Sequence, residues 1–147
     1  MKTIVLGFIV FLIILIPAVQ AQEPVEILVD LLEADQETGK TEPSLYYVQE
    51  KIQRTPFRFR NFQLLDSQTL VIHPSQSQKA SFSSPVPLEI SVSHAGTRAG
   101  ATLLGLTIRS RETLVLESEL SLSGQQTVLI GIPDRQRTLL VAISQGL

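Results

Sequence analysis

The densest alternation of apolar and polar positions in the chain lies between Ala101 and Ile143. Aliphatic residues recur there at about every second position, which is the spacing of a β-strand with one buried face. The apolar positions are Leu104, Leu106, Ile108, Leu114, Leu116, Leu120, Leu122, Thr127 to Ile130 and Leu139 to Ile143. We predict three or four strands here, separated by turns at Ser110-Arg111, Ser123 to Gln125 and Pro133 to Arg137.

Shorter alternating segments run through the first part of the chain. They are Val25 to Leu31, Phe57 to Leu64, Leu70 to His73, Ala80 to Phe82 and Leu88 to Val92. The apolar phase slips at Asn61, which predicts a β-bulge, and Asp66 to Gln68 predict a hairpin turn. The Pro-rich surroundings of Ala80 and Phe82 predict a short edge strand.

Polar or glycine-containing connections are expected at Glu33 to Glu42 and at His94 to Gly100. A single amphipathic helix is predicted over residues 43–54. Pro43 suits its first turn, and Leu45, Val48 and Ile52 follow at helical spacing. The helix should end at Thr55-Pro56, because a proline disfavours the helical conformation of the preceding residue. We expect this helix to cover an open end or an edge of the sheet.

These elements predict a mainly β fold, at the margin of α+β, in one domain over residues 22–147. Eight or nine strands in series with short turns favour antiparallel pairing. We therefore expect a two-layer sandwich or a small barrel with one helix near its N-terminal end.

The first 21 residues have the features of a secretory signal peptide. Lys2 is followed by an apolar run from Ile4 to Ile16, and Val19-Gln20-Ala21 presents small or aliphatic residues to a signal peptidase. Cleavage between Ala21 and Gln22 is the prediction. Retention as an anchor is the alternative, but the run is shorter than the roughly 20 residues that span a bilayer.

Charge and cysteine content limit the cellular compartments and the classes of partner that suit this chain. Lys2 is the one basic residue among the first 21, so 11 of the 12 Lys and Arg remain against 14 Asp and Glu, a net charge of −3. We therefore expect no nucleic-acid partner. The chain has no cysteine, so an exported fold must be held by its core, as suits a periplasmic or secreted bacterial protein.

Motifs for cofactors or metals are weak. Residues 34–41 fit a loose phosphate-loop pattern, but they lack its first glycine, are acidic and belong to a chain of serial strands. The same segment lacks the spacing of a calcium loop. His73 and His94 are expected to be surface residues next to turns and form no zinc pattern. We predict neither a cofactor nor a metal.

Catalytic patterns are equally weak, so we expect no enzyme. No serine lies in a nucleophile elbow, and Glu117 and Glu119 are explained by a solvent-facing strand. A few residues could instead form a contact surface. They are Arg58 and Arg60, predicted to share one face of a strand, with Tyr46, Tyr47 and Phe82.

The segment from Leu114 to Ile130, which continues into Gly131, resembles the strand–turn–strand segment of bacterial secretins. Secretins are the outer-membrane rings of type II and III secretion and of type IV pili, and there a strand leads into a D-G-Q-T turn and a V-V-I-G-G ending. The similarity depends on Gly124, Thr127 and Gly131, whereas Ser123 replaces the aspartate and Ile132 the second glycine. It implies a β-domain of the bacterial envelope and not pore formation.

Two functions remain open from the sequence. The first is a non-enzymatic domain with an envelope protein as partner, reached by strand addition at the edge around Ala80 to Phe82, and with no stable membrane insertion after signal removal. The second is a periplasmic small-ligand binding protein, with a pocket between the sheets or under the helix near Tyr46 and Tyr47.

Overall fold

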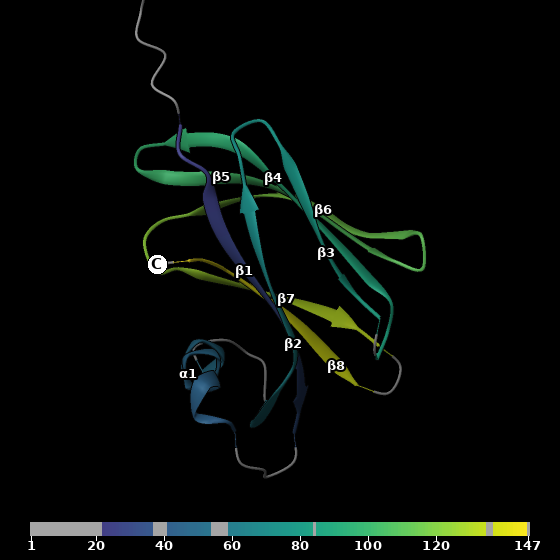
Figure 1. The fold of residues 1–147 in the computed structure, drawn as a ribbon. Helices are drawn as coiled ribbons and strands as arrows, with labels where there is room; N and C mark the ends of the chain where they lie inside the picture. Colours follow the sequence, from purple (N-terminus) through teal and green to yellow (C-terminus); the bar gives the residue numbers. More distant parts are fainter. Residues whose placement is uncertain (1–21, 37–40, 54–58, 84, 135–136, 147) are drawn as a thin grey trace, which may run out of the picture.

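The protein is a sandwich of two four-stranded antiparallel sheets with one short helix (Figure 1). The computed structural model describes residues 22–36, 41–53, 59–83, 85–134 and 137–146. The strands are β1 (Val25–Asp35), β2 (Asn61–Ile72), β3 (Ser77–Phe82), β4 (Leu88–Arg98), β5 (Ala101–Ser110), β6 (Thr113–Leu122), β7 (Thr127–Pro133) and β8 (Thr138–Gln145). A 3-10 turn η1 (Pro43–Leu45) leads into α1 (Tyr46–Gln53). The prediction of a mainly β antiparallel fold is confirmed.

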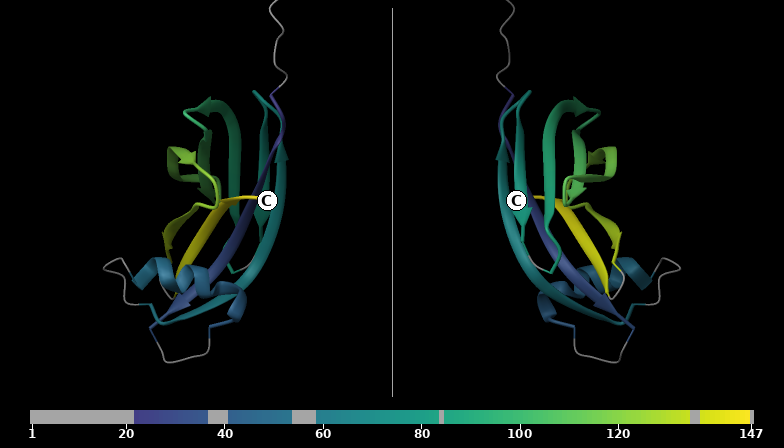
Figure 2. Two further views of the ribbon diagram at one scale, coloured as in Figure 1. Left: turned by 90° about the vertical axis from the view of Figure 1, so that its left-hand side faces the viewer. Right: turned by 90° about the vertical axis from the view of Figure 1, so that its right-hand side faces the viewer.

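The strands are ordered β2-β1-β8-β7 in one sheet and β3-β4-β5-β6 in the other. Figure 2 shows the two sheets as separate layers, so the fold is the sandwich and not the barrel of the two predicted alternatives. The chain passes from one sheet to the other between β2 and β3 and again between β6 and β7. The C-terminal strands that the sequence places together are therefore divided between the two layers.

The main core lies between the sheets and consists of the inward positions of both. Alternation is strict from Leu88 to His94 in β4 and from Ala101 to Ile108 in β5, where every second side chain is buried. The largest fully buried side chains of this core are Ile27, Leu31, Ile72, Ile90, Leu104, Leu106, Ile108, Leu122 and Leu139. Removal of this apolar surface from water is the dominant stabilising contribution to such a fold.

A second core lies on the opposite side of the β2-β1-β8-β7 sheet, beneath the helix. Its buried members are Leu32, Ala34, Leu45, Val48, Ile52, Phe62, Leu140 and Ala142. The helix thus covers a face of the sheet, and the expectation that it covers an end or an edge is wrong (Figure 2). The physical reason is that β1 and β8 carry apolar residues on both faces, and the outer face also has to be buried.

The predicted helix is confirmed in its described part, with Pro43 in the first turn. Its predicted end at Thr55-Pro56 lies outside the described residues, as do the predicted signal peptide up to Ala21 and Phe57. Gln22, the other residue of the predicted cleavage site, is exposed ahead of β1. In the described part of the chain, no helix is long and apolar enough to cross a membrane.

The hairpin turn predicted at Asp66 to Gln68 is wrong, because β2 continues through these residues and pairs with β1 along its whole length. The predicted bulge exists, but it lies at Leu65 and not at Asn61. Leu64 pairs with Leu32 and Asp66 with Leu31, so Leu65 is the extra residue. A sequence phase slip shows that a bulge is needed but does not fix its position.

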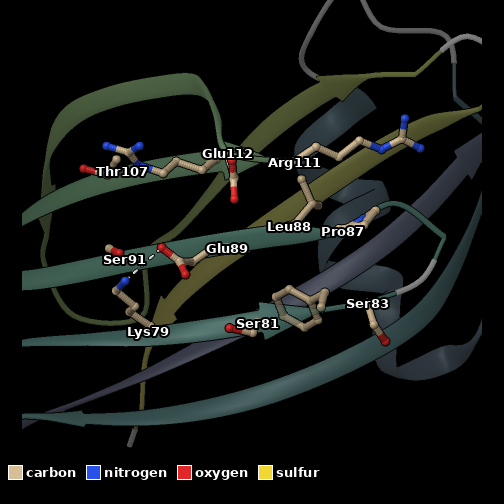
Figure 3. Close-up of a pocket in the computed structure, with 12 residues that line it drawn as sticks. Lys79, Ser81, Ser83, Pro87, Leu88, Glu89, Ser91, Thr107, Arg111 and Glu112 are labelled. Carbon is tan, nitrogen blue, oxygen red and sulfur yellow. Dashed lines mark hydrogen bonds and ion pairs between the residues drawn. The ribbon is translucent and has the colours of Figure 1, made fainter.

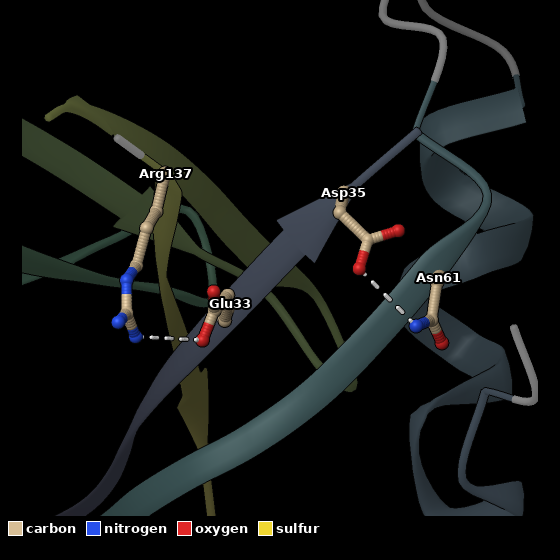
Figure 4. Close-up of polar contacts among 4 residues, drawn as sticks. All are labelled: Glu33, Asp35, Asn61 and Arg137. Atoms are coloured by element: carbon tan, nitrogen blue, oxygen red, sulfur yellow. Dashed lines mark hydrogen bonds and ion pairs between the residues drawn. The ribbon is translucent and has the colours of Figure 1, made fainter. Parts of the chain in front are cut away.

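Two predicted connections are shorter than expected. β4 extends to Arg98 through a bulge after His94, and the turn to β5 is confined to Ala99 and Gly100, both with positive φ. β1 extends to Asp35, into the predicted polar connection. Figure 4 shows why its charged residues are tolerated: Arg137 Nη1 lies 3.3 Å from Glu33 Oε2, and Asn61 Nδ2 donates to Asp35 Oδ2 at 3.3 Å.

The second core should contribute substantially to stability. We expect Phe62→Ala to lower the free energy of unfolding by about 3–5 kcal/mol, because Phe62 is fully buried between helix and sheet. Urea unfolding followed by circular dichroism measures this. Tyr46→Ala, on the exposed side of the same helix, should change it by no more than about 0.5 kcal/mol. Equal effects of the two variants would contradict the placement of the helix.

Candidate functional site

The structure does not gather the predicted contact residues into one surface. Tyr46 is 56% exposed and Tyr47 half-buried on the helix, whereas Phe82 is buried between the sheets. Phe82 therefore belongs to the core, and its prediction as a contact residue is wrong. Arg60 is exposed but precedes β2, so it is not on a strand face, and Arg58 lies outside the described residues.

The edge around Ala80 to Phe82 is confirmed as an edge strand, yet its outer side is partly occupied. Gln68 of β2 donates from Nε2 to the Ser81 carbonyl oxygen at 2.7 Å. Its Oε1 accepts the Ser81 backbone N–H at 3.2 Å. The side-chain amide of Gln68 thus satisfies the same two groups that an added strand would use, which weakens β3 as a site of strand addition.

The opposite edge of the same sheet, β6, is less covered. β6 pairs with β5 on one side, and no described strand pairs with its other side. Leu114 is 49% exposed and Val115 41% exposed, which is unusual among the large apolar side chains of the described residues. Val115 is a bulge residue between the pairs Leu116–Ile108 and Leu114–Arg109. We call the stretch Leu114–Ser121 the β6 edge.

Charge on the β6 edge is acidic. Glu117 and Glu119 are exposed, in agreement with the predicted solvent-facing stripe, while Leu116 and Leu120 on either side of the pair are half-buried. The edge therefore combines unpaired backbone, exposed aliphatic side chains and negative charge. The turn that follows it has Gly124 at a φ of +58°, a conformation that favours glycine.

A groove of about 580 Å³ lies between the outer face of the β2-β1-β8-β7 sheet and the start of the helix. Asp30 of β1 is 7% exposed and lines it. Ser67 Oγ donates to Asp30 Oδ1 at 2.6 Å, and Tyr47 Oη donates to Oδ2 at 3.2 Å. We call Asp30, Tyr47 and Ser67 with their surrounding walls the Asp30 groove.

Sequence reasoning identified Tyr47 but missed Asp30 and Ser67. The alternation of Val25 to Leu31 predicts a strand but assigns no role to Asp30. The signal that could have found it is the outward series Leu28, Asp30 and Leu32, because a carboxylate between two leucines indicates a covered face and needs hydrogen-bond donors there.

The outer face of the other sheet is also hollowed, over about 790 Å³ (Figure 3). Its side chains carry both signs of charge: Lys79 Nζ lies 2.9 Å from Glu89 Oε1, and Arg109, Arg111 and Glu112 are exposed around them. Exposed pairs of this kind contribute little energy, and their mixed signs select no class of ligand.

His94 is not the surface residue that the sequence predicts. It is 4% exposed, follows the inward series of β4, and neither ring nitrogen has a hydrogen-bond partner among the described residues. The bulge after His94 continues the strand, so the ring is carried into the core and not into a loop. His73, in contrast, is exposed as predicted.

Comparison of the chain with models of protein families, with characterised proteins and with solved structures finds no match. The functional argument therefore depends on the chain's own sequence and geometry. The resemblance of Leu114 to Ile130 to secretins stays a prediction. The structure divides that segment between β6 and β7, which belong to different sheets.

His94 should reduce stability, because two buried polar atoms lack partners. We expect His94→Leu to raise the free energy of unfolding by about 1–3 kcal/mol in chemical denaturation at neutral pH. His73→Leu is the matched control at an exposed position and should leave stability nearly unchanged. A destabilised His94→Leu protein would mean that the ring has a structural partner.

Tyr47 predicts a loss of stability at alkaline pH. Burial, and then the negative charge and hydrogen bond of Asp30, raise the pKa of the Tyr47 hydroxyl well above its usual range. Because the folded state holds this proton more tightly, its contribution is complete below the unfolded pKa of about 10 and decreases as pH rises above it. Tyr47→Phe should therefore lose less stability than the wild type between about pH 9 and 11, whereas Tyr46→Phe should behave like the wild type.

Proposed function

We propose that the protein is an exported, non-enzymatic β-sandwich domain that acts through protein contacts in the bacterial envelope. A secretion or pilus system is its proposed setting. The export prediction depends on the pattern of the first 21 residues, and the absence of cysteine is consistent with a fold that an exported bacterial chain can form without disulfides. The setting depends on the secretin resemblance of Leu114 to Ile130.

The β6 edge carries this proposal. An unpaired strand edge offers a row of N–H and C=O groups to a second extended chain, and natural folds usually blunt such edges. β3 is blunted by Gln68, whereas β6 has exposed Leu114 and Val115 beside unpaired backbone. Strand addition would satisfy the backbone and cover both aliphatic side chains in one step.

The acidic side chains of the β6 edge favour a partner strand with basic residues over a second copy of this chain. In an antiparallel pair of two β6 strands centred on Ser118, Glu117 of each would lie opposite Glu119 of the other. Like charges directly opposite destabilise such pairs. A partner with Lys or Arg at alternate positions would instead pair with both carboxylates.

The test is photo-crosslinking in the intact envelope of the producing bacterium. A photoreactive residue in place of Glu119 should give one discrete adduct, whereas the same residue in place of Lys79 on β3 should give none. Leu114→Lys with Val115→Lys should abolish the Glu119 adduct, because the apolar contact is lost. Mass spectrometry of the adduct then identifies the partner, which tests whether the partner belongs to a secretion or pilus system.

Two results would contradict the proposal. One is adducts of equal yield from both positions, and the other is none from Glu119 in protein that circular dichroism shows to be folded. An adduct with a protein unrelated to secretion or pili would retain the contact function and remove the setting.

The second candidate is a small-ligand binding protein, and the Asp30 groove favours it. The groove lies beneath the helix near Tyr47, where a ligand pocket was predicted from the sequence. Its volume is within the range of small-molecule sites, and it has apolar walls with a few convergent polar groups. The two candidate functions use different sheets. Both can therefore hold in one protein, and each can be tested separately.

A further inference from the structure

The Asp30 groove has apolar walls and one charged group. Its apolar walls are Leu28 of β1, Leu45 of η1 and Leu64 of β2. The polar residues that line it are Asp30, Ser44, Tyr47, Ser67, Gln125, Thr127, Ser144 and Gln145. Asp30 is the only one of the described lining residues with a formal charge, so the charge that these residues contribute to the groove is negative.

The Asp30 carboxylate has no positive partner in the described part of the chain. Its hydrogen bonds come from two neutral hydroxyls, those of Ser67 and Tyr47. Lys51 of the helix donates instead to the Thr127 carbonyl oxygen, at 2.6 Å. A carboxylate that is almost wholly buried and unpaired with a cation is costly, and an incoming cation would relieve that cost.

The carboxylate is also held in position for a ligand. Asp30 lies on a central strand, between Ser67 of β2 and Ala142 of β8 in the register of the sheet. A carboxylate has about four acceptor positions, of which the two hydroxyls use two, so acceptor capacity remains. Asp30 itself lines the groove, so its remaining acceptor positions can be reached by a molecule bound there.

We propose that the Asp30 groove binds a small molecule with an ammonium group on an apolar body. The ammonium donates to Asp30, and the apolar body lies against Leu28, Leu45 and Leu64. An anionic ligand would be repelled by Asp30, and no cationic side chain is among the described residues that line the groove. A divalent metal ion needs more oxygen ligands than Asp30 supplies, and no cluster of three metal-binding side chains occurs among the described residues.

This inference rests on the second candidate function and deepens it, because it names the class of ligand that the Asp30 groove would bind; it does not depend on the β6 edge, which belongs to the other sheet. The experiment is isothermal titration calorimetry of the full chain with three matched probes: 2-phenylethylamine, 2-phenylethanol and 3-phenylpropionate. The three share one apolar body and differ in charge. We expect the amine to bind about 10- to 100-fold more tightly than the alcohol, and the carboxylate to show no binding.

Asp30→Asn is the decisive variant, because it keeps the shape and one of the two acceptor oxygens while removing the charge. It should lower the affinity for the amine to that for the alcohol, and Glu89→Gln on the other sheet should leave the affinity unchanged. Thermal unfolding verifies that Asp30→Asn is folded. If Asp30→Asn is not folded, two other measurements test the inference. They are the affinity of Leu64→Ala for the amine and the comparison of the three probes with the wild type.

Equal binding of amine and alcohol, or no saturable binding of the amine at about 10 mM, would overturn the inference. So would an unchanged affinity in folded Asp30→Asn. The β6 crosslinking result should be the same in Asp30→Asn and wild type, so failure of one proposal is distinguishable from failure of the other.

Discussion

Burial of β1 and β8 on both faces is the constraint on which the rest of the structure depends. The inward faces of these strands form the core between the sheets, and their outward faces require a cover. The helix supplies it through Leu45, Val48 and Ile52. Because the helix is held there by apolar contacts, the phenol of Tyr47 is brought over Asp30. The groove is thus a consequence of how the second core is closed.

The bulge at Leu65 makes this arrangement compatible with one long strand. Before the bulge, Phe62 and Leu64 face the helix, and after it Leu70 and Ile72 face the core between the sheets. The change of phase brings Ser67 to the helix side, opposite Asp30 in the register. Without the extra residue, one end of β2 would present its apolar side chains to the wrong layer.

The sequence was sufficient for the strands whose outward faces meet solvent, because alternation is unambiguous there. β4 and β5 are the clearest cases. It was insufficient where polar residues lie inside a long strand, as at Asp66 to Gln68, since the same residues are typical of turns. It also could not locate the helix, because the continuous apolar run of β8 shows that two faces are buried but not what covers each.

The candidate site was predictable only in part for a related reason. A pocket near Tyr47 was one of the alternatives that the predicted helix allowed. The role of Asp30 could not be predicted, because it depends on the register of the sheet, which places Ser67 and Ala142 on either side of it. His94 shows a similar dependence, since β4 continues through it instead of ending there, and its pairing with Leu104 keeps it on the inward face of the strand.

Two of the buried polar side chains, Asp30 and His94, differ in a way that separates a candidate site from a structural cost. Asp30 has two donors and borders a groove, so its burial leaves acceptor capacity facing a space that a ligand can enter. His94 has no partner and lines neither of the two hollows described above. A buried charge that is held by donors and open on one side is preorganised for an opposite charge, whereas an unpartnered buried ring only lowers stability. That difference directs the search for a ligand to the outer face of the β2-β1-β8-β7 sheet and not to the space between the sheets.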